Sequence, residues 1–174
     1  MKDKFDVTAL KKPKKKKKIN SRAKGNRFEN KVAKLLNERF QTEDFCRTPG
    51  SGAFATTHKL PKHLQLYGDL ITPLKFKFII ECKSGYNEER ICDLLNPNSN
   101  ISNMIATAFR DSKKSCKNFL FIIGQDRRKP SVITNDFHLE VGGDYFRGKI
   151  KGEAVIMYSL EDLLNANDSY FLEQ

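Results

Sequence analysis

The residue types best suited to chemistry in this chain gather at the end of one apolar segment. Residues 76–83 read Phe-Lys-Phe-Ile-Ile-Glu-Cys-Lys, a pattern that predicts a buried strand. Side chains alternate along a strand, so one face carries Glu81 and Lys83, and the other carries Phe78, Ile80 and Cys82. A carboxylate and an ammonium are therefore aimed at one spot.

A second carboxylate, Asp69, lies on the preceding strand candidate. Segments 67–72 and 75–83, joined around Pro73, predict a hairpin. If its centre lies near Lys75, Asp69 faces Glu81 across the ladder. Two carboxylates about 4 Å apart repel by about 4 kcal/mol at an effective dielectric near 20. A positive group should therefore lie between them.

A divalent cation satisfies this requirement. Carboxylates without a neighbouring His favour Mg²⁺, with Mn²⁺ as a substitute, and such an ion lowers the pKa of bound water and neutralises charge on a phosphodiester. Lys83 could orient or deprotonate the attacking water or stabilise the pentacovalent phosphate, and the residues alone do not choose among these roles. The alternative is that Glu81 and Lys83 form an ordinary ion pair at a strand end and that Asp69 begins a turn.

The elements that position these residues follow from hydrophobic spacing. Apolar residues at helical spacing predict an amphipathic helix from Ser21 to Phe40, capped by Ser21 or Asn26. Residues 45–61 predict a short strand and then a long loop. Residues 99–117 predict a second helix leading into the buried strand 119–123, which indicates a crossover onto the same sheet. Strands at 129–137 and 152–158 and a helix at 159–165, capped by Ser159, complete an α/β fold with a mixed sheet.

Four motifs occur in a fixed order. They are Ser-Arg-Ala-Lys-Gly-Asn-Arg-Phe-Glu at 21–29, Phe-Cys-Arg-Thr-Pro-Gly-Ser-Gly-Ala at 45–53, Gly-Asp-Leu-Ile at 68–71 and Ile-Ile-Glu-Cys-Lys at 79–83. Together they resemble the PD-(D/E)XK nuclease superfamily, and within it most closely the archaeal-type Holliday junction resolvases. The resemblance covers residues 21 to about 85. It implies a restriction-endonuclease-like core, a central mixed β-sheet flanked by helices.

The resemblance also implies roles for individual residues. Asp69, Glu81 and the backbone carbonyl of Cys82 would bind the metal directly, Glu29 would bind it through water, and Lys83 would be catalytic. The serine of the Gly-Ser-Gly element would lie near the scissile phosphate, which makes Ser51 a further catalytic candidate. We expect DNA contacts from basic residues of the motifs and of the following loop, namely Arg22, Lys24, Arg27, Arg47, Lys59 and Lys62.

The sequence departs from the resolvase pattern in three places. Gly68 stands where the family usually has Pro before the Asp, a change expected to affect strand entry more than metal binding. The spacing between Gly52 and Asp69 is longer than the family's, which affects the placement of Ser51. The last third of the chain, including Asp-Tyr-Phe-Arg at 144–147, matches no motif of the family.

Most of the positive charge lies at the N-terminus. The chain has 174 residues and a formal net charge of +11; residues 1–24 contain ten Lys, one Arg and two Asp, which leaves only +2 for the rest. A block of like charges without apolar residues predicts a disordered tail over residues 1–20 and one nuclease domain over 21–174. Such a tail favours DNA phosphates, although a solubility role or a nuclear import signal is the alternative.

Composition excludes other classes of protein. No apolar run approaches the ~20 residues needed to span a bilayer, and no leader-like apolar segment begins the chain. We therefore expect no membrane partner and an intracellular, cytoplasmic location, in the host cytoplasm if the protein is phage-encoded and nuclear only if the organism is eukaryotic. None of the four cysteines forms a C-x-x-C pair, which argues against a zinc ribbon.

The residues and the resemblance together predict a Mg²⁺-dependent, structure-selective DNA endonuclease, most closely a Holliday junction resolvase. The resemblance implies that it hydrolyses phosphodiesters to leave 5′-phosphate ends. A junction has two-fold symmetry and needs paired nicks, so we expect a homodimer on branched or double-stranded DNA. One alternative is another PD-(D/E)XK nuclease that acts on flaps, nicks or foreign DNA. The other is a basic nucleic-acid-binding protein without catalytic activity.

Overall fold

The computed structural model describes residues 20–49, 67–138 and 143–173. Their strands form a seven-stranded sheet in the order β1-β2-β3-β4-β5-β7-β6. Only β3 and β4 pair in parallel among the described strands. The strands are β1 (Cys46–Arg47), β2 (Leu70–Ile71), β3 (Phe78–Ser84), β4 (Asn118–Gly124), β5 (Ser131–Thr134), β6 (Phe146–Ile150) and β7 (Glu153–Ser159). The α/β class and the mixed sheet are confirmed.

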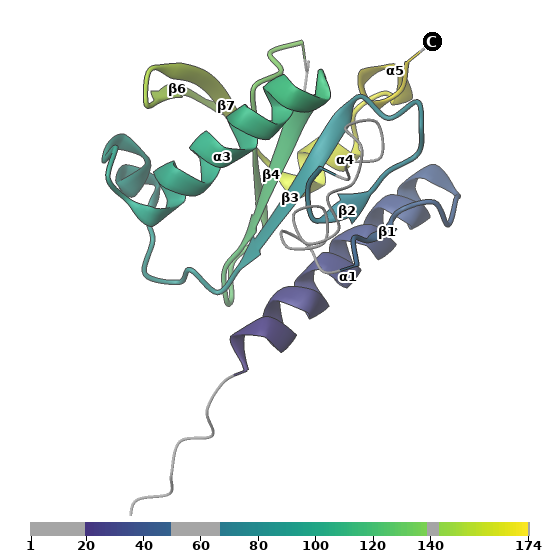
Figure 1. Ribbon diagram of the computed structural model, residues 1–174, viewed down its shortest axis with the longest axis horizontal. Helices are drawn as coiled ribbons and strands as arrows, with labels where there is room; N and C mark the ends of the chain where they lie inside the picture. Colours follow the sequence, from purple (N-terminus) through teal and green to yellow (C-terminus); the bar gives the residue numbers. More distant parts are fainter. Residues whose placement is uncertain (1–19, 50–66, 139–142, 174) are drawn as a thin grey trace, which may run out of the picture.

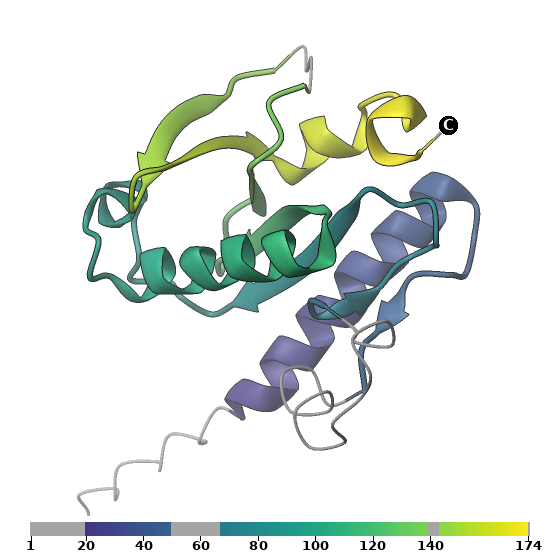
Figure 2. The ribbon, with the colours of Figure 1, turned by 45° about the horizontal axis from the view of Figure 1, so that its top comes forward.

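Helices cover both faces of the sheet (Figures 1 and 2). On one face, α1 (Ser21–Phe40), α4 (Leu160–Leu164) and α5 (Asp168–Phe171) pack against the side chains of Phe78, Ile80 and Cys82. On the other face, α3 (Asn100–Ser115) packs against β4, and the 3-10 helix η3 (Ile91–Leu95) packs against α3 and β6. The sheet is therefore the middle layer between two apolar cores, and β3 contributes to both.

Chain order and hydrophobic spacing predict most of these elements correctly. The hairpin of β2 and β3 is antiparallel, and α3 connects β3 to the parallel strand β4, which confirms the crossover. Ser159 caps α4, accepting a hydrogen bond from the Asp162 amide. The predicted cap of α1 was wrong: Asn20 holds that position, because its side-chain oxygen accepts from the Ala23 amide at 3.1 Å.

Three of the predicted site residues lie where the structure gives no description. Ser51, Lys59 and Lys62 fall between residues 50 and 66, outside the described residues. No helix in the described ranges is both long enough and apolar enough to cross a membrane.

Candidate active site

The hairpin of β2 and β3 brings Asp69 and Glu81 together. The register pairs Leu70 with Ile80, so the next positions along the ladder are Asp69 and Glu81. Lys83 Nζ lies 2.8 Å from Asp69 Oδ2 and 2.9 Å from Glu81 Oε2. The predicted facing of the two carboxylates is confirmed, and the positive group between them is the Lys83 ammonium.

Backbone contacts fix the position of Asp69. Its Oδ2 also accepts a hydrogen bond from the Cys82 amide at 2.8 Å, and its own amide donates to the Ile80 carbonyl at 2.7 Å. These two bonds hold the carboxylate at the point where β2 and β3 separate. Asp69 is 8% exposed, so its charge is held away from bulk water.

Gly68 makes this close approach possible. Its φ is +84°, and a Cβ built there would lie 2.5 Å from the Ile80 carbonyl oxygen. Positive φ is costly for residues with a side chain, and the pyrrolidine ring of proline fixes φ near −65°. The absence of the usual Pro before Asp69 thus has a geometric reason: this hairpin enters β2 through a conformation that only glycine adopts readily.

Burial and charge shift the pKa values of the two groups next to Asp69. Burial, and then the negative charge of Asp69, raise the pKa of Glu81 to about 7. Burial by itself would lower the pKa of the Lys83 ammonium, but the charges of Glu81 and Asp69 raise it above its ordinary value. Two carboxylates thus share one protonated lysine, and further positive charge would stabilise the ionised form of Glu81.

Glu29 approaches from α1, which covers the face of β3 that carries Cys82. The Glu29 side chain is buried and accepts a hydrogen bond from Arg47 Nε of β1 at 2.7 Å. No described hydrogen bond joins Glu29 to Asp69 or Glu81; its described partner is Arg47. This pairing could not be read from the sequence, because the two residues meet only when α1 packs on the β1 edge.

The other basic candidates of α1 differ in their surroundings. Lys24 Nζ lies 2.8 Å from both carboxylate oxygens of Asp126, and the Asn87 side chain also donates to Asp126. Arg22 and Arg27 are exposed and form no ion pair within the described part of the chain. Arg22 and Arg27 are consequently free to meet a phosphate, whereas Lys24 would first have to leave Asp126.

The donor set of the hairpin fits a hard divalent cation. The described residues contain no group of three His, Cys, Asp or Glu side chains arranged around one point. Asp69, Glu81 and the Cys82 carbonyl nevertheless supply oxygen donors, the kind that Mg²⁺ and Mn²⁺ prefer. With one ammonium for two carboxylates, the cluster carries an excess negative charge that such a cation would neutralise.

Sequence reasoning missed one polar residue beside Asp69. The Thr48 amide donates to the Asp69 carbonyl at 2.9 Å, and the Thr48 side chain is 3% exposed, with a hydroxyl that has no hydrogen-bond partner among the described residues. A buried hydroxyl without a partner is costly. The sequence around Thr48, Arg-Thr-Pro-Gly, does not indicate a buried hydroxyl without a partner.

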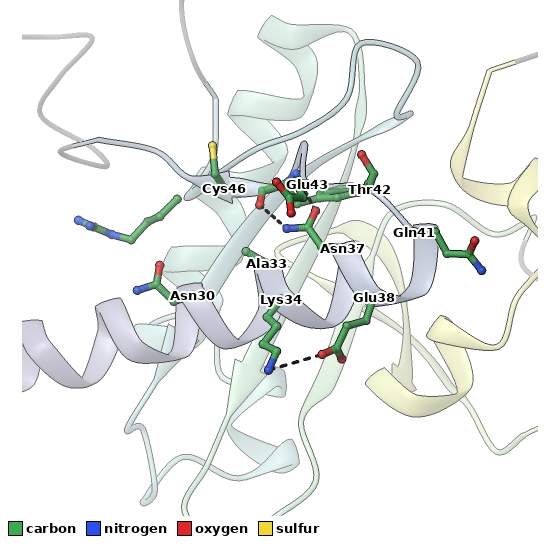
Figure 3. A pocket seen from close by; sticks show the side chains of 11 residues that line it. Asn30, Ala33, Lys34, Asn37, Glu38, Gln41, Thr42, Glu43 and Cys46 are labelled. Atoms are coloured by element: carbon green, nitrogen blue, oxygen red, sulfur yellow. Dashed lines mark hydrogen bonds and ion pairs between the residues drawn. The ribbon is translucent and has the colours of Figure 1, made fainter.

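A groove of about 850 Å³ lies between α1 and the segment that leads into β1 (Figure 3). Asn30, Lys34, Asn37 and Glu38 of α1 line it together with Cys46 and Arg47. The side chain of Asn37 donates to the Phe45 carbonyl and accepts from its amide, which anchors this segment to α1. Asp69, Glu81 and Lys83 do not line the groove, so it is not the candidate active site.

Comparison with known protein families finds one match to the chain. Residues 20–172 match the family described as "Phage putative PDDEXK endonuclease". The match includes every described element and confirms the resemblance to the PD-(D/E)XK superfamily, while the closer likeness to archaeal resolvases stays a prediction. No curated protein and no solved structure matches the chain.

Proposed function

Because this chain belongs to the phage PDDEXK endonuclease family, we propose that it is a divalent-metal-dependent DNA endonuclease whose active centre is the hairpin of β2 and β3. The observation that carries the proposal is the sharing of one ammonium by two buried carboxylates, with Lys83 Nζ 2.8 Å from Asp69 and 2.9 Å from Glu81. Two carboxylates can hold a divalent cation, and a lysine between them can donate hydrogen bonds to the phosphate or to the attacking water.

Each residue of the hairpin has a proposed role. Asp69, Glu81 and the Cys82 carbonyl would hold Mg²⁺, or Mn²⁺ in its place, and Glu29 would reach it through water. A cation held there supplies charge neutralisation and a more acidic water. Lys83 then positions the attacking water or donates hydrogen bonds to the phosphate, and its raised pKa favours the protonated, hydrogen-bond-donating form. Ser51 would lie near the scissile phosphate.

We further propose that the substrate is branched DNA and that the enzyme is a Holliday junction resolvase. The support is the order of its four motifs, which resembles that of resolvases. Such an enzyme acts in the cytoplasm of the phage host, leaves 5′-phosphate and 3′-hydroxyl ends, and works as a homodimer, because a two-fold symmetric junction needs two active centres. A nuclease acting on flaps, nicks or foreign DNA would use the same residues and fits the family match equally well.

A substrate panel tests both levels of the proposal. The purified chain is incubated with a synthetic four-way junction, a duplex, a flap and a single strand, each with Mg²⁺, with Mn²⁺ and with EDTA. We expect paired nicks in the junction with either metal and none in EDTA. Preferred cleavage of flaps or duplex would replace the resolvase assignment with the broader nuclease. Binding without cleavage of any substrate would refute the enzyme and leave a DNA-binding protein.

A further inference from the structure

The exposed edge of the sheet at β6 carries side chains that the proposed active centre does not use. β6 is the last strand of the sheet and pairs only with β7 among the described strands; Figures 1 and 2 show this hairpin at the margin of the molecule. Tyr145 is 55% and Phe146 42% exposed. Arg147 and Lys149 are exposed as well. This edge therefore presents both aromatic and cationic side chains to solvent, with Tyr145 and Phe146 on opposite sides of the strand.

The aromatic and cationic side chains of this edge lie in a row along the strand. Alternation places Tyr145, Arg147 and Lys149 on one side, about 7 Å apart from one to the next, and Lys151 follows in the turn. The Arg147 guanidinium lies over the Tyr145 ring, 5.0 Å from its centroid, a stacking that holds it in place. We call these four residues the β6 surface.

The cations of the β6 surface form no ion pair with any acidic residue that the structure describes. Within the described ranges, no carboxylate forms an ion pair with Arg147, Lys149 or Lys151, and Lys151 donates only to the Asn103 side chain. Elsewhere, exposed lysines such as Lys113 and Lys129 are paired with glutamates. Glu153 of the same hairpin pairs with Lys113 of α3 and not with a cation of the β6 surface. Positive charge left unpaired along one edge attracts a polyanion.

A second copy of the chain is a poorer partner for this edge. Antiparallel pairing of two β6 strands about Gly148 would set Arg147 of each copy opposite Lys149 of the other, and like charges directly opposite are destabilising. DNA has the complementary charge. We therefore propose that the β6 surface binds the phosphate backbone of DNA, an inference that rests on the proposed function for the identity of the substrate.

The position of β6 in the sheet indicates which part of the DNA the β6 surface would contact. β6 is four strand positions from β3, or about 19 Å at the usual spacing of strands. The paired registers put Arg147 and Lys149 on the opposite face of the sheet from Glu81 and Lys83. The contact would therefore be made with a DNA arm that passes round the β6 edge, beyond the position of cleavage.

The test measures DNA binding by the full chain in EDTA, where no cleavage is expected. Fluorescence anisotropy with a labelled four-way junction is recorded over a range of salt concentrations for the double variant Arg147→Gln/Lys149→Gln. Its matched control, Lys34→Gln/Lys129→Gln, removes two exposed cations that are paired with glutamates. If Arg147 and Lys149 each neutralise one phosphate, their removal should lower the slope of log K against log salt by about 1.8 and weaken binding about 60-fold near 0.1 M salt. The control should keep the wild-type slope.

Equal slopes for the two double variants would overturn the proposal. The proposal would also be overturned if the Arg147→Gln/Lys149→Gln variant lost self-association in sedimentation while its salt slope stayed at the wild-type value. The β6 edge would then be an interface with a second copy of the chain. Lysine acetylation of the wild-type chain supplies a measurement free of folding effects: DNA should protect Lys149 and Lys151, and undiminished labelling would count against the contact. If the salt slope depends on Arg147 and Lys149 but the chain cleaves no substrate, only the proposed function is refuted. If the chain cleaves DNA but the salt slope does not depend on these two residues, only the β6 surface is refuted.

Discussion

Substitution of Gly68 should damage the hairpin more than an ordinary loop substitution would. At φ +84°, an alanine costs about 1–2 kcal/mol of backbone strain. Its Cβ would also lie 2.5 Å from the Ile80 carbonyl oxygen, so β2 must move and the 2.7 Å hydrogen bond from the Asp69 amide is broken or stretched. Breaking a buried hydrogen bond adds about 1–3 kcal/mol. The free energy of unfolding should therefore fall by about 2–5 kcal/mol in Gly68→Ala.

Gly152 offers a matched control for this prediction. Its φ is +85°, but nothing lies within 4 Å of a Cβ placed there, so Gly152→Ala should cost only the strain of about 1–2 kcal/mol. Urea unfolding measures both free energies. Because the displaced amide belongs to Asp69, Gly68→Ala should also weaken Mn²⁺ binding by calorimetry, while Gly152→Ala should not. Equal losses of stability and unchanged metal affinity in both variants would refute the close approach at Gly68.

Three other perturbations follow from the same structure. Arg47→Met should lower the free energy of unfolding by about 2–4 kcal/mol, because it leaves the buried Glu29 carboxylate unpaired; the double variant with Glu29→Gln should regain much of this, and chemical denaturation checks both. Because the pKa of Glu81 is raised from 4.5 to about 7, the folded chain holds a proton that the unfolded chain has released, so in EDTA the stability should decrease from about pH 4.5 to pH 7. In thermal melts, Glu81→Gln should lose less stability than wild type over this pH range. An identical pH profile for the two proteins would contradict a raised pKa at Glu81. Deletion of residues 1–18 should weaken DNA binding and reduce its salt dependence by about 0.9 for each phosphate that the tail neutralises, and an unchanged salt slope would place all the phosphate contacts in the rest of the chain.

The core of the candidate site was predictable because it depends on local pattern. Alternation along 76–83 separates Glu81 and Lys83 from the apolar face, and a short turn fixes the register, so the facing of Asp69 and Glu81 follows from counting residues. The helix α1 follows equally from the spacing of its apolar residues. Local periodicity and turn length were sufficient for these features.

Features of the structure that the sequence did not predict depend mainly on packing between distant segments. The Glu29–Arg47 pair joins α1 to β1, and the Lys24–Asp126 pair joins α1 to the turn after β4; neither has a signal in the sequence. β6 escaped prediction because an edge strand has little apolar alternation, and its central Gly148 is unfavourable in a strand. The Asn20 cap lies at the junction with the lysine-rich segment, where Ser21 and Asn26 offered equally suitable side chains.

The placement of the active centre is best tested by separating the effect of Glu81 on cleavage from its effect on binding. Single-turnover cleavage of a labelled junction with Mg²⁺ is compared for wild type, Glu81→Gln and the control Glu161→Gln, whose carboxylate pairs with Lys129 on the surface. We predict that Glu81→Gln binds the junction at least as tightly as wild type but shows no cleavage, and that Glu161→Gln cleaves normally. Cleavage by Glu81→Gln at the wild-type rate would contradict an active centre at the hairpin of β2 and β3.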